Sequence, residues 1–353
     1  MAVWNIKNVS IKGISGSIPD NIVKNADLNL FTSEESKLLI KSVGIAERPV
    51  ATDKICASDL CFSAAEQLLK DLSWNKDSIN SLIFESVTRD YRTPPTSCIL
   101  QHRLNLSENT FTLDIPMGCC GFMYGMVVAG NLMQSGTVKR TLLLVGDTAS
   151  RMGSSQDKSR VPLFGDAGVA IALEYNENAN PMIIELNTDG SGYKALITPH
   201  GEFREPATPD SFIYHDFGKG IIRRPIDALI DGMEVFGFAI SKPSKSIKNF
   251  FQVYNIDKDN DIDYFLIHQA NKSIIKRLVK KLDLPIEKVP MDIEQYGNTG
   301  GASVPFLIVA RLREQAMTKP LTLLASSFGL GLTWGTMLFK TEPMVISKLI
   351  KVK

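Results

Sequence analysis

The chain has 353 residues, 44% of them hydrophobic and 22% charged, a composition typical of globular proteins that excludes a disordered or fibrous chain. Its formal net charge of +1 excludes a general attraction to nucleic acid or anionic membranes, so any recognition by charge must come from a local cluster. The sequence has no basic segment followed by a long apolar run and no stretch of about 18 apolar residues. We therefore expect a cytoplasmic protein that does not enter a membrane.

Short apolar runs alternate with longer amphipathic stretches along the chain. Ser81–Phe84 and Tyr264–Ile267 predict buried strands, whereas Ser58–Leu72 and Asn271–Leu282 have the period of helices. Strand alternating with helix predicts an α/β fold with a mainly parallel sheet. Pro243 lies in a polar run and predicts a helix start or a loop.

The length is sufficient for two packed halves. The segment Tyr175–Pro181 loses the apolar period, so we place the boundary after residue 177 and predict halves of residues 1–177 and 178–353. A turn of small residues opens an apolar helix at Gly118–Leu132 and again at Gly297–Leu312. This echo indicates an internal duplication.

Five cysteines occur without the spacing of a metal site, so we expect reduced thiols and no bound metal. The segment GCCGFMYG predicts a tight turn feeding a helix that ends at Gly136. A cysteine at the N-terminus of that helix would have a lowered thiol pKa, because unpaired N–H groups and the helix dipole stabilise the thiolate. The alternative is that Cys119 and Cys120 are both small packing residues. Helix geometry alone does not choose between the two thiols.

Three further segments carry candidate polar groups. His268 follows the apolar run YFLI and should lie at the C-terminal edge of a strand, where open α/β sheets form ligand clefts. Such a histidine can transfer a proton or donate to an oxyanion, although a single histidine is often structural. Asn298 in YGNTGGAS offers amide donors, or is simply a helix cap. The glycine-rich stretch Ser326–Gly335 either brings backbone N–H groups to a ligand or is a bulged strand.

Together these segments resemble the β-ketoacyl-acyl-carrier-protein synthase III family of condensing enzymes, in which cysteine, histidine, asparagine and glycine-rich strand follow in this order. VGIAER (Val43–Arg48), TRDYRTPPTSCILQHRL (Thr88–Leu104), LFGDAG (Leu163–Gly168) and DGMEVFGFAI (Asp231–Ile240) extend the resemblance over nearly the whole chain. The resemblance implies a thiolase-like fold, with two duplicated α/β halves packed as a five-layered αβαβα sandwich, and a homodimer.

The resemblance also implies an activity and roles for individual residues. Cys119 would be the acyl-accepting nucleophile, with the backbone N–H groups of Cys119 and Leu330 as oxyanion hole. His268 and Asn298 would be the other catalytic residues, stabilising the enolate formed when malonyl-acyl-carrier protein loses carbon dioxide. The expected reaction is a decarboxylative condensation in fatty acid biosynthesis, without metal or cofactor. Two alternatives are an acyltransferase or ketosynthase of specialised metabolism with a non-malonyl acceptor, and a non-catalytic thiolase-fold partner.

The chain departs from the family pattern on the donor side. Leu38 and Ser42 stand where many members have a tryptophan and an arginine that hold the coenzyme A adenine, so an acyl-carrier-protein donor becomes more credible than acyl-coenzyme A. Lys158 and Arg160 are the predicted donor contacts in this region. Thr93 replaces a phenylalanine that, in some members, gates the acyl pocket from the neighbouring subunit. The smaller side chain predicts a pocket that tolerates medium or long acyl chains.

The helix after His268 carries a basic face. Lys272, Lys276 and Lys280 follow one another at four-residue spacing, and Arg277 and Lys281 lie beside them. A basic face next to the catalytic histidine would attract an acidic acyl-carrier protein. The simpler alternative is a solvated helix surface.

Overall fold

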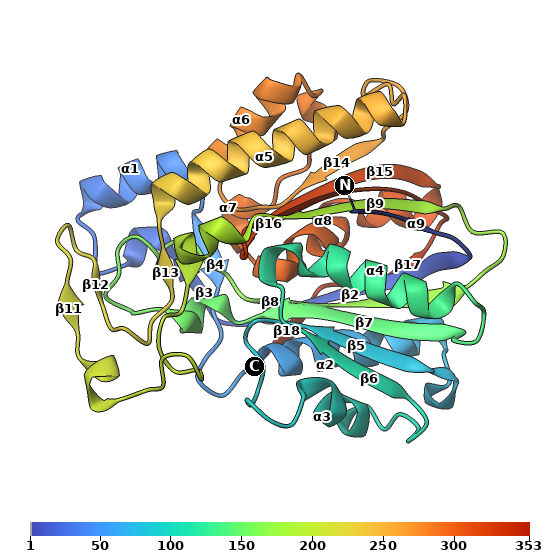
Figure 1. Ribbon diagram of the computed structural model, residues 1–353, viewed down its shortest axis with the longest axis horizontal. Helices are drawn as coiled ribbons and strands as arrows, with labels where there is room; N and C mark the ends of the chain where they lie inside the picture. The colour runs from blue at the N-terminus through green and yellow to red at the C-terminus, as the bar shows by residue number, and fades with distance from the viewer. Residues whose placement is uncertain (1) are drawn as a thin grey trace.

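The computed structural model describes residues 2–353, which form five layers in the order helix, sheet, helix, sheet, helix (Figure 1). One outer layer contains α2 (Ala57–Leu72) and α3 (Thr96–Arg103), and the other contains α5 (Gly232–Val253) and α6 (Lys272–Leu282). Between the two sheets lie α4 (Gly121–Met133) and α8 (Ser303–Arg311), which touch both of them. The predicted αβαβα sandwich is confirmed.

The first sheet has seven strands. Its order is β17 (Val345–Ile346), β2 (Val9–Pro19), β8 (Ala167–Tyr175), β7 (Arg140–Asp147), β5 (Ser81–Glu85) and β6 (Phe111–Ile115), and β18 (Ile350–Val352) also pairs with β2. Strand β5 runs parallel to both β6 and β7, whereas β8 is antiparallel to β7 and β2. Strand β6 therefore forms an open edge of this sheet.

The second sheet has five strands. Their order is β1 (Ala2–Ile6), β9 (Met182–Thr188), β16 (Thr333–Thr341), β15 (Leu321–Gly329) and β14 (Tyr264–Ile267). Only β14 and β15 are parallel; the other three pairs are antiparallel. The prediction of a mainly parallel sheet is wrong for this second sheet, where β15 and β16 join through a tight turn. In the first sheet four of the six strand pairs are parallel, as predicted.

The two sheets exchange terminal strands. The segment 176–181 connects β8 of the first sheet to β9 of the second, close to the predicted boundary. However, β1 pairs with β9 in the second sheet, and β17 and β18 pair with β2 in the first. The division after residue 177 remains a prediction, because each proposed half contributes strands to the sheet of the other.

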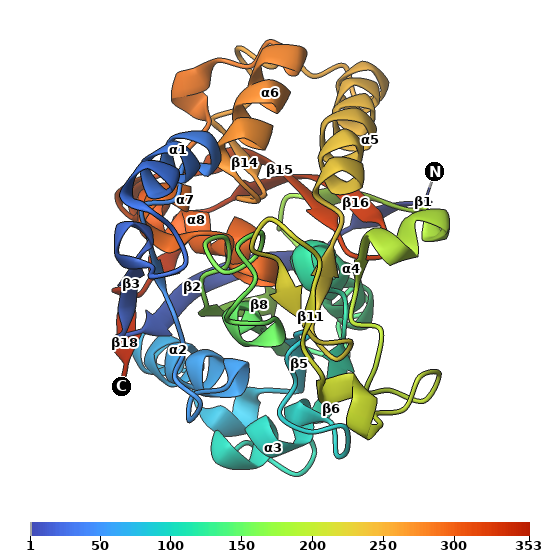
Figure 2. The same cartoon turned by 90° about the vertical axis from the view of Figure 1, so that its left-hand side faces the viewer.

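Most of the remaining elements lie toward one end of the sandwich, on the left in Figure 1: α1 (Ser33–Val43), α7 (Ile293–Tyr296) and the strand pairs β3 (Ile22–Lys24) with β4 (Glu47–Pro49), β10 (Leu196–Ile197) with β13 (Leu229–Ile230), and β11 (His215–Asp216) with β12 (Ile222–Arg223). Helix α9 (Arg313–Thr318) lies at the other end, against α8 and β17. Figure 2 shows α5 and α6 side by side above the second sheet, with α1 next to α6. In Figure 1 the pair β11 and β12 extends from the body.

The predicted helices are confirmed with one exception. In α6 the Asn271 side chain accepts a hydrogen bond from the Ile274 N–H at 2.8 Å, and the apolar face of the helix is buried as its period predicts. Pro243 lies inside α5 rather than at a helix start or in a loop. The helix continues past the proline because its apolar face is buried, with Phe238 before Pro243 and Phe250 after it.

Substitution of Phe306 in α8 tests the packing of the central helical layer. Its side chain is fully buried between the two sheets, in a cluster that includes Ile14 and Leu323. Phe306→Ala should lower the free energy of unfolding by about 3–5 kcal/mol, because a large cavity is left in a close-packed layer. Urea denaturation measures the change. Val253→Ala is the control, because that side chain is 59% exposed, and it should shift the free energy by less than about 1 kcal/mol.

Candidate active site

The two neighbouring cysteines have different surroundings. A short 3-10 turn, Gly118–Cys120, follows β6 and leads directly into α4. Cys119 lines a pocket, whereas Cys120 is fully buried away from it. Gly118 has a φ of +57°, and a side chain there would collide with Leu330. The tertiary structure therefore presents Cys119, and not Cys120, to a ligand.

His268 directly follows β14 and is 1% exposed. Its ring packs edge-on against Phe328, with centroids 5.3 Å apart and an interplanar angle of 85°. Burial lowers the pKa of the imidazole to about 4, so the ring is neutral near pH 7. Within residues 2–353, Nδ1 has no hydrogen-bond partner. A neutral imidazole in an apolar setting suits hydrogen bonding to an oxyanion better than holding a permanent charge.

Asn298 follows α7 and is held by its own backbone and side chain. Its N–H donates to the Leu163 carbonyl at 2.9 Å, and its carbonyl accepts from the Gly165 N–H at 3.1 Å. Oδ1 accepts a hydrogen bond from the Gly300 N–H at 3.0 Å. With Oδ1 occupied, the amide nitrogen is the group left to donate into the pocket.

One pocket brings these groups together, with an empty volume of about 1060 Å³ that includes its open mouth. Cys119, His268 and Asn298 line it, as do Gly329 and Leu330 at the end of β15. The Gly329 backbone approaches the nucleophile so closely that a Cβ there would lie 2.7 Å from the Cys119 Sγ. Much of the remaining wall is apolar, formed by Met152, Leu163, Phe164, Leu196, Ile197 and Val235.

Two buried carboxyl groups near the cysteine were missed from the sequence. Asp147, the last residue of β7, lines the pocket and accepts hydrogen bonds from the Val87 N–H at 2.9 Å and the Gly301 N–H at 3.1 Å. Burial raises its pKa to about 6. Glu85, the last residue of β5, is fully buried, and burial followed by the charge of Asp147 raises its pKa well above the usual range. In the sequence each of these acidic residues stands at the end of an apolar run, and this pattern could have identified them as candidates.

The expectation of an acidified thiol was wrong. Burial raises the pKa of the Cys119 thiol to about 12, and the carboxylates of Asp147 and Glu85 add to the rise. The backbone N–H groups of Leu330 and of Cys119 itself lower the pKa only in part. The helix N-terminus is thus opposed by desolvation and by negative charge. In the free protein Cys119 rests as a thiol at neutral pH.

Comparison with known proteins agrees with this geometry. Residues 113–192 match the 3-oxoacyl-[acyl-carrier-protein (ACP)] synthase III family, and residues 256–341 match its C-terminal region. The chain is 32% identical to the β-ketoacyl-[acyl-carrier-protein] synthase III of Rhodopirellula baltica, covering 95% of this chain and 99% of the relative. It is 31% identical to the enzyme of the same name from Streptococcus pyogenes, covering 94% of this chain and 98% of that one. The chain belongs to the β-ketoacyl-acyl-carrier-protein synthase III family.

Solved structures of synthases from this family have the same fold. The crystal structure of the 3-oxoacyl-(acyl-carrier protein) synthase from Burkholderia xenovorans superimposes with a TM-score of 0.93 at 35% identity, covering 99% of both chains. The synthase III of Pseudomonas aeruginosa gives a TM-score of 0.82 at 26% identity, covering 96% of this chain and 100% of that one. The thiolase-like fold predicted from the sequence is confirmed, and the chain is an enzyme of the condensing type.

The donor side of this synthase-family pocket differs from the sequence-based expectation in one respect. Arg160 lines the pocket and is 6% exposed. Lys158 does not line it; its Nζ pairs with Glu35 at 3.1 Å. Leu38 is 68% exposed on α1, and the Ser42 hydroxyl donates to the Leu39 carbonyl. These side chains form no platform of the kind that the family uses for adenine.

The basic residues of α6 lie outside the pocket lining, although Asn271 and Ile274 at the start of the helix belong to it. Lys276, Arg277, Lys280 and Lys281 are exposed, and Lys272 is half-buried and pairs with Glu294 at 3.4 Å. The Arg277 guanidinium stands 5.2 Å from the ring centre of Phe236, a pocket residue. The basic face therefore begins at the mouth of the pocket and extends outward.

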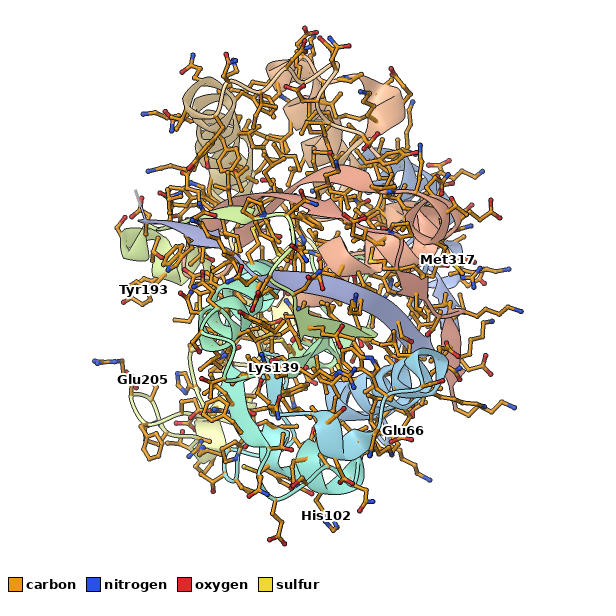
Figure 3. All side chains as sticks on the ribbon, turned by 90° about the vertical axis from the view of Figure 1, so that its right-hand side faces the viewer. Glu66, His102, Lys139, Tyr193, Glu205 and Met317 are labelled. Carbon is orange, nitrogen blue, oxygen red and sulfur yellow. The ribbon has the colours of Figure 1, made fainter. Side chains whose placement is uncertain are left out.

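Other predicted or alternative groups lie away from the catalytic residues. Thr93 is exposed and is not part of the pocket of this single chain. Figure 3 shows His102 at the outer edge of the molecule, on α3. Residues 2–353 contain no group of three or more His, Cys, Asp or Glu side chains arranged to hold a metal ion. In the same range no helix is both long and apolar enough to cross a membrane.

The environment of Cys119 predicts how it reacts with iodoacetamide. Because its pKa is about 12, the alkylation rate should rise continuously from pH 7 to pH 10, without the plateau of an acidic thiol. Asp147→Asn removes a negative charge, lowers the thiol pKa and should raise the rate at pH 8 by about tenfold for each pKa unit gained. Peptide mass spectrometry reads each thiol separately, and the exposed Cys98 is the internal control. A plateau below pH 9, or an unchanged rate in Asp147→Asn, would contradict this description.

Proposed function

We propose that Cys119 accepts an acyl group from a thioester donor and passes it to a carbanion generated from malonyl-acyl-carrier protein. In the first half, Sγ attacks the donor carbonyl carbon and the tetrahedral oxygen accepts hydrogen bonds from the N–H groups of Cys119 and Leu330. Collapse of this intermediate breaks the carbon–sulfur bond of the donor. The proton of the Cys119 thiol leaves with the departing carrier thiol.

In the second half, the bond between the malonyl methylene carbon and its carboxylate breaks and carbon dioxide leaves. The electron pair remains as an enolate whose oxygen accepts hydrogen bonds from His268 and Asn298. The methylene carbon then attacks the acyl carbon on Cys119, and the carbon–sulfur bond breaks to release a β-ketoacyl thioester and the Cys119 thiolate, which takes up a proton from solvent to restore the thiol. Neither step requires a metal or a cofactor.

One observation carries the proposal: a thiol, a neutral imidazole and an anchored amide line the same pocket as the Leu330 backbone. Both N–H groups assigned to the oxyanion hole already act on the Cys119 sulfur, as their effect on its pKa shows. Donors fixed before the substrate binds stabilise a developing charge without the cost of reorganising solvent. A non-catalytic partner subunit has no need of this arrangement.

We also propose an acyl-carrier protein as partner, a homodimer as the assembly and the cytoplasm as the location. The basic face of α6 at the pocket mouth supports docking of an acidic carrier protein, with acyl-coenzyme A as a possible second donor. The open edge strand β6 supports dimerisation, as do five exposed apolar side chains of the segment 203–217, namely Phe203, Phe212, Ile213, Tyr214 and Phe217. Figure 3 shows Glu205, two residues after Phe203 in the sequence, on a loop that extends from the body.

In such a dimer Thr93 would act on the partner's pocket rather than on its own. It is exposed and follows Arg92, which donates to the Gly201 carbonyl of the same extended loop. A threonine occupies less space than a phenylalanine would at this position. We therefore keep the proposal that the acyl pocket accepts medium or long chains.

Malonyl decarboxylation tests the reaction itself. His268→Ala and Asn298→Ala should each slow carbon dioxide release from malonyl-acyl-carrier protein by about 10²–10³-fold, because each removes one donor to the enolate. Acylation of Cys119 should persist in both variants, and intact-protein mass spectrometry measures it. Because the His268 pKa is about 4, the rate should not break near pH 6.5 and should fall only as pH approaches 4. Release that is as fast in both variants as in the native protein, or absent from the native protein, would favour a non-malonyl acceptor.

Charge reversal tests the docking face. Lys276→Glu combined with Lys280→Glu should lower kcat/KM for carrier-protein substrates by about tenfold or more and weaken its dependence on salt, because both side chains are exposed on the basic face. Lys319→Glu with Lys340→Glu, at two exposed positions outside α6, is the matched control with the same change in net charge. Equal kinetics for the two double variants would exclude α6 as the docking surface.

A further inference from the structure

A second cavity opens beside the active-site pocket. Its empty volume is about 630 Å³, and it shares Ala149, Arg160 and Phe164 with the first pocket. Arg48 lines its wall, together with Val23 and Leu28 from the segment before α1 and Ser150, Ser154 and Ser155 from the loop after β7. Two arginines thus line a cavity that adjoins the catalytic residues.

Both arginines are buried without a contacting counter-ion. Arg48 is 3% exposed and Arg160 is 6% exposed, and within residues 2–353 neither has a carboxylate oxygen within 4.0 Å. Arg48 donates to Asn25 Oδ1 at 3.0 Å and to the Phe164 carbonyl at 2.8 Å. Arg160 donates to the Ala149 carbonyl at 2.9 Å, which uses one of its five N–H groups. Burial lowers the pKa of each to about 10, so both remain charged at neutral pH.

The nearest acidic groups are engaged elsewhere. Asp166 accepts hydrogen bonds from the Ala51 N–H and from the N–H and hydroxyl of Ser150. Asp157 pairs with Arg223 at 3.6 Å, and Asp227 pairs with Arg224 at 2.8 Å. Buried cations are normally paired or hydrogen-bonded, because losing water otherwise costs several kcal/mol. The free N–H groups of Arg160 are therefore matched to an anion that comes from outside the chain.

The Arg160 side chain is also fixed in place. A Cβ at Gly153 would collide with its Cδ and Nε, so the glycine leaves the space through which the side chain passes. The guanidinium lies 4.3 Å from the ring centre of Phe164. A guanidinium held by packing loses little freedom on binding and can present two parallel N–H groups to a carboxylate.

We propose that Arg160, with Arg48 as a second positive charge in the same cavity, binds a terminal carboxylate on the acyl group of the donor. This inference rests on the proposed function, since it concerns what Cys119 accepts. Arg160 is the only lysine or arginine among the described residues that line the active-site pocket, which Cys119 lines as well. When Cys119 accepts the acyl group, the phosphate at the far end of the pantetheine arm remains with the carrier. The acyl chain, in contrast, then extends from the sulfur of Cys119 itself.

The carboxylate of the malonyl group is a poorer occupant. It loses its charge as carbon dioxide leaves, so a cation bound to it would stabilise the reactant more than the transition state and slow the reaction. A carboxylate at the far end of the donor acyl group keeps its charge throughout. Binding it therefore selects the donor without opposing condensation.

The test compares hexanoyl-pantetheine with adipyl-pantetheine, which have equal chain lengths, differ by one terminal carboxylate and contain no phosphate. Intact-protein mass spectrometry follows the acylation of Cys119. Arg160→Gln should lower the ratio of adipyl to hexanoyl rates by about tenfold or more, because it removes a charged donor to a carboxylate. Arg160→Lys should lose part of this preference. Arg204→Gln, at an exposed position outside both cavities, should keep the native ratio.

Adipate gives a second readout that does not depend on acyl transfer. It should raise the thermal midpoint of the native protein more than the uncharged adipamide does at equal ionic strength, and this difference should disappear in Arg160→Gln. If Arg160→Gln does not fold, Arg160→Lys replaces it in both experiments.

Three outcomes overturn the inference. The first is an equal loss of both acylation rates in a folded Arg160 variant, which would indicate a purely structural side chain. The second is a preference that follows the phosphate when phosphopantetheine thioesters are used, whatever the acyl group. The third is an adipate effect that survives in the Arg160 variants. Failure of both donors to acylate native Cys119 would instead reject the proposed function, and the thermal experiment would still decide the inference.

Discussion

Glu85 fills the space between the two turns that carry Cys119 and Asn298, and the geometry of the site depends on this packing. Its carboxyl group lies so close to Gly121 and Gly301 that a Cβ at either position would overlap it. Gly121 begins the helix after Cys119, and Gly301 belongs to the turn after Asn298. The end of strand β5 therefore sets how closely the cysteine turn and the asparagine turn approach each other. Larger residues at either glycine would separate the nucleophile from its partners.

The same burial determines the charges in the pocket. Low polarity keeps His268 neutral and keeps Cys119 protonated, and it leaves Asp147 as an anion with a pKa of about 6. The thiol is therefore a weak nucleophile in the free protein. This arrangement protects an otherwise reactive cysteine in the free protein. It differs from sites in which a neighbouring cation maintains the thiolate.

The proposed specificity for the donor arises at a different place from the proposed chemistry. The proposed catalytic groups come from the edges of the two sheets, whereas Arg160 lies in the loop after β7 and lines both cavities. Leu38 and Ser42 of α1 line neither cavity, and Lys158 is engaged with Glu35. Among the described residues, Arg160 is the only lysine or arginine that lines the active-site pocket. Donor recognition as proposed therefore depends on residues other than those proposed for condensation.

The sequence by itself determined the elements and the order of the catalytic groups. Apolar periods located β14 and α6, and the family pattern singled out Cys119, His268 and Asn298, because motifs of this kind are local in the chain. Local patterns do not report strand direction, so the mixed sheets were not predicted, and Pro243 was misplaced because burial of its helix on a sheet outweighs the missing hydrogen bond.

Tertiary structure alone decided everything that depends on burial. The high pKa of Cys119, the neutral His268, the carboxyl groups of Asp147 and Glu85 and the unpaired Arg160 all arise from residues distant in sequence that together exclude water. Desolvation is a property of the assembled pocket, and no single segment of the chain contains it.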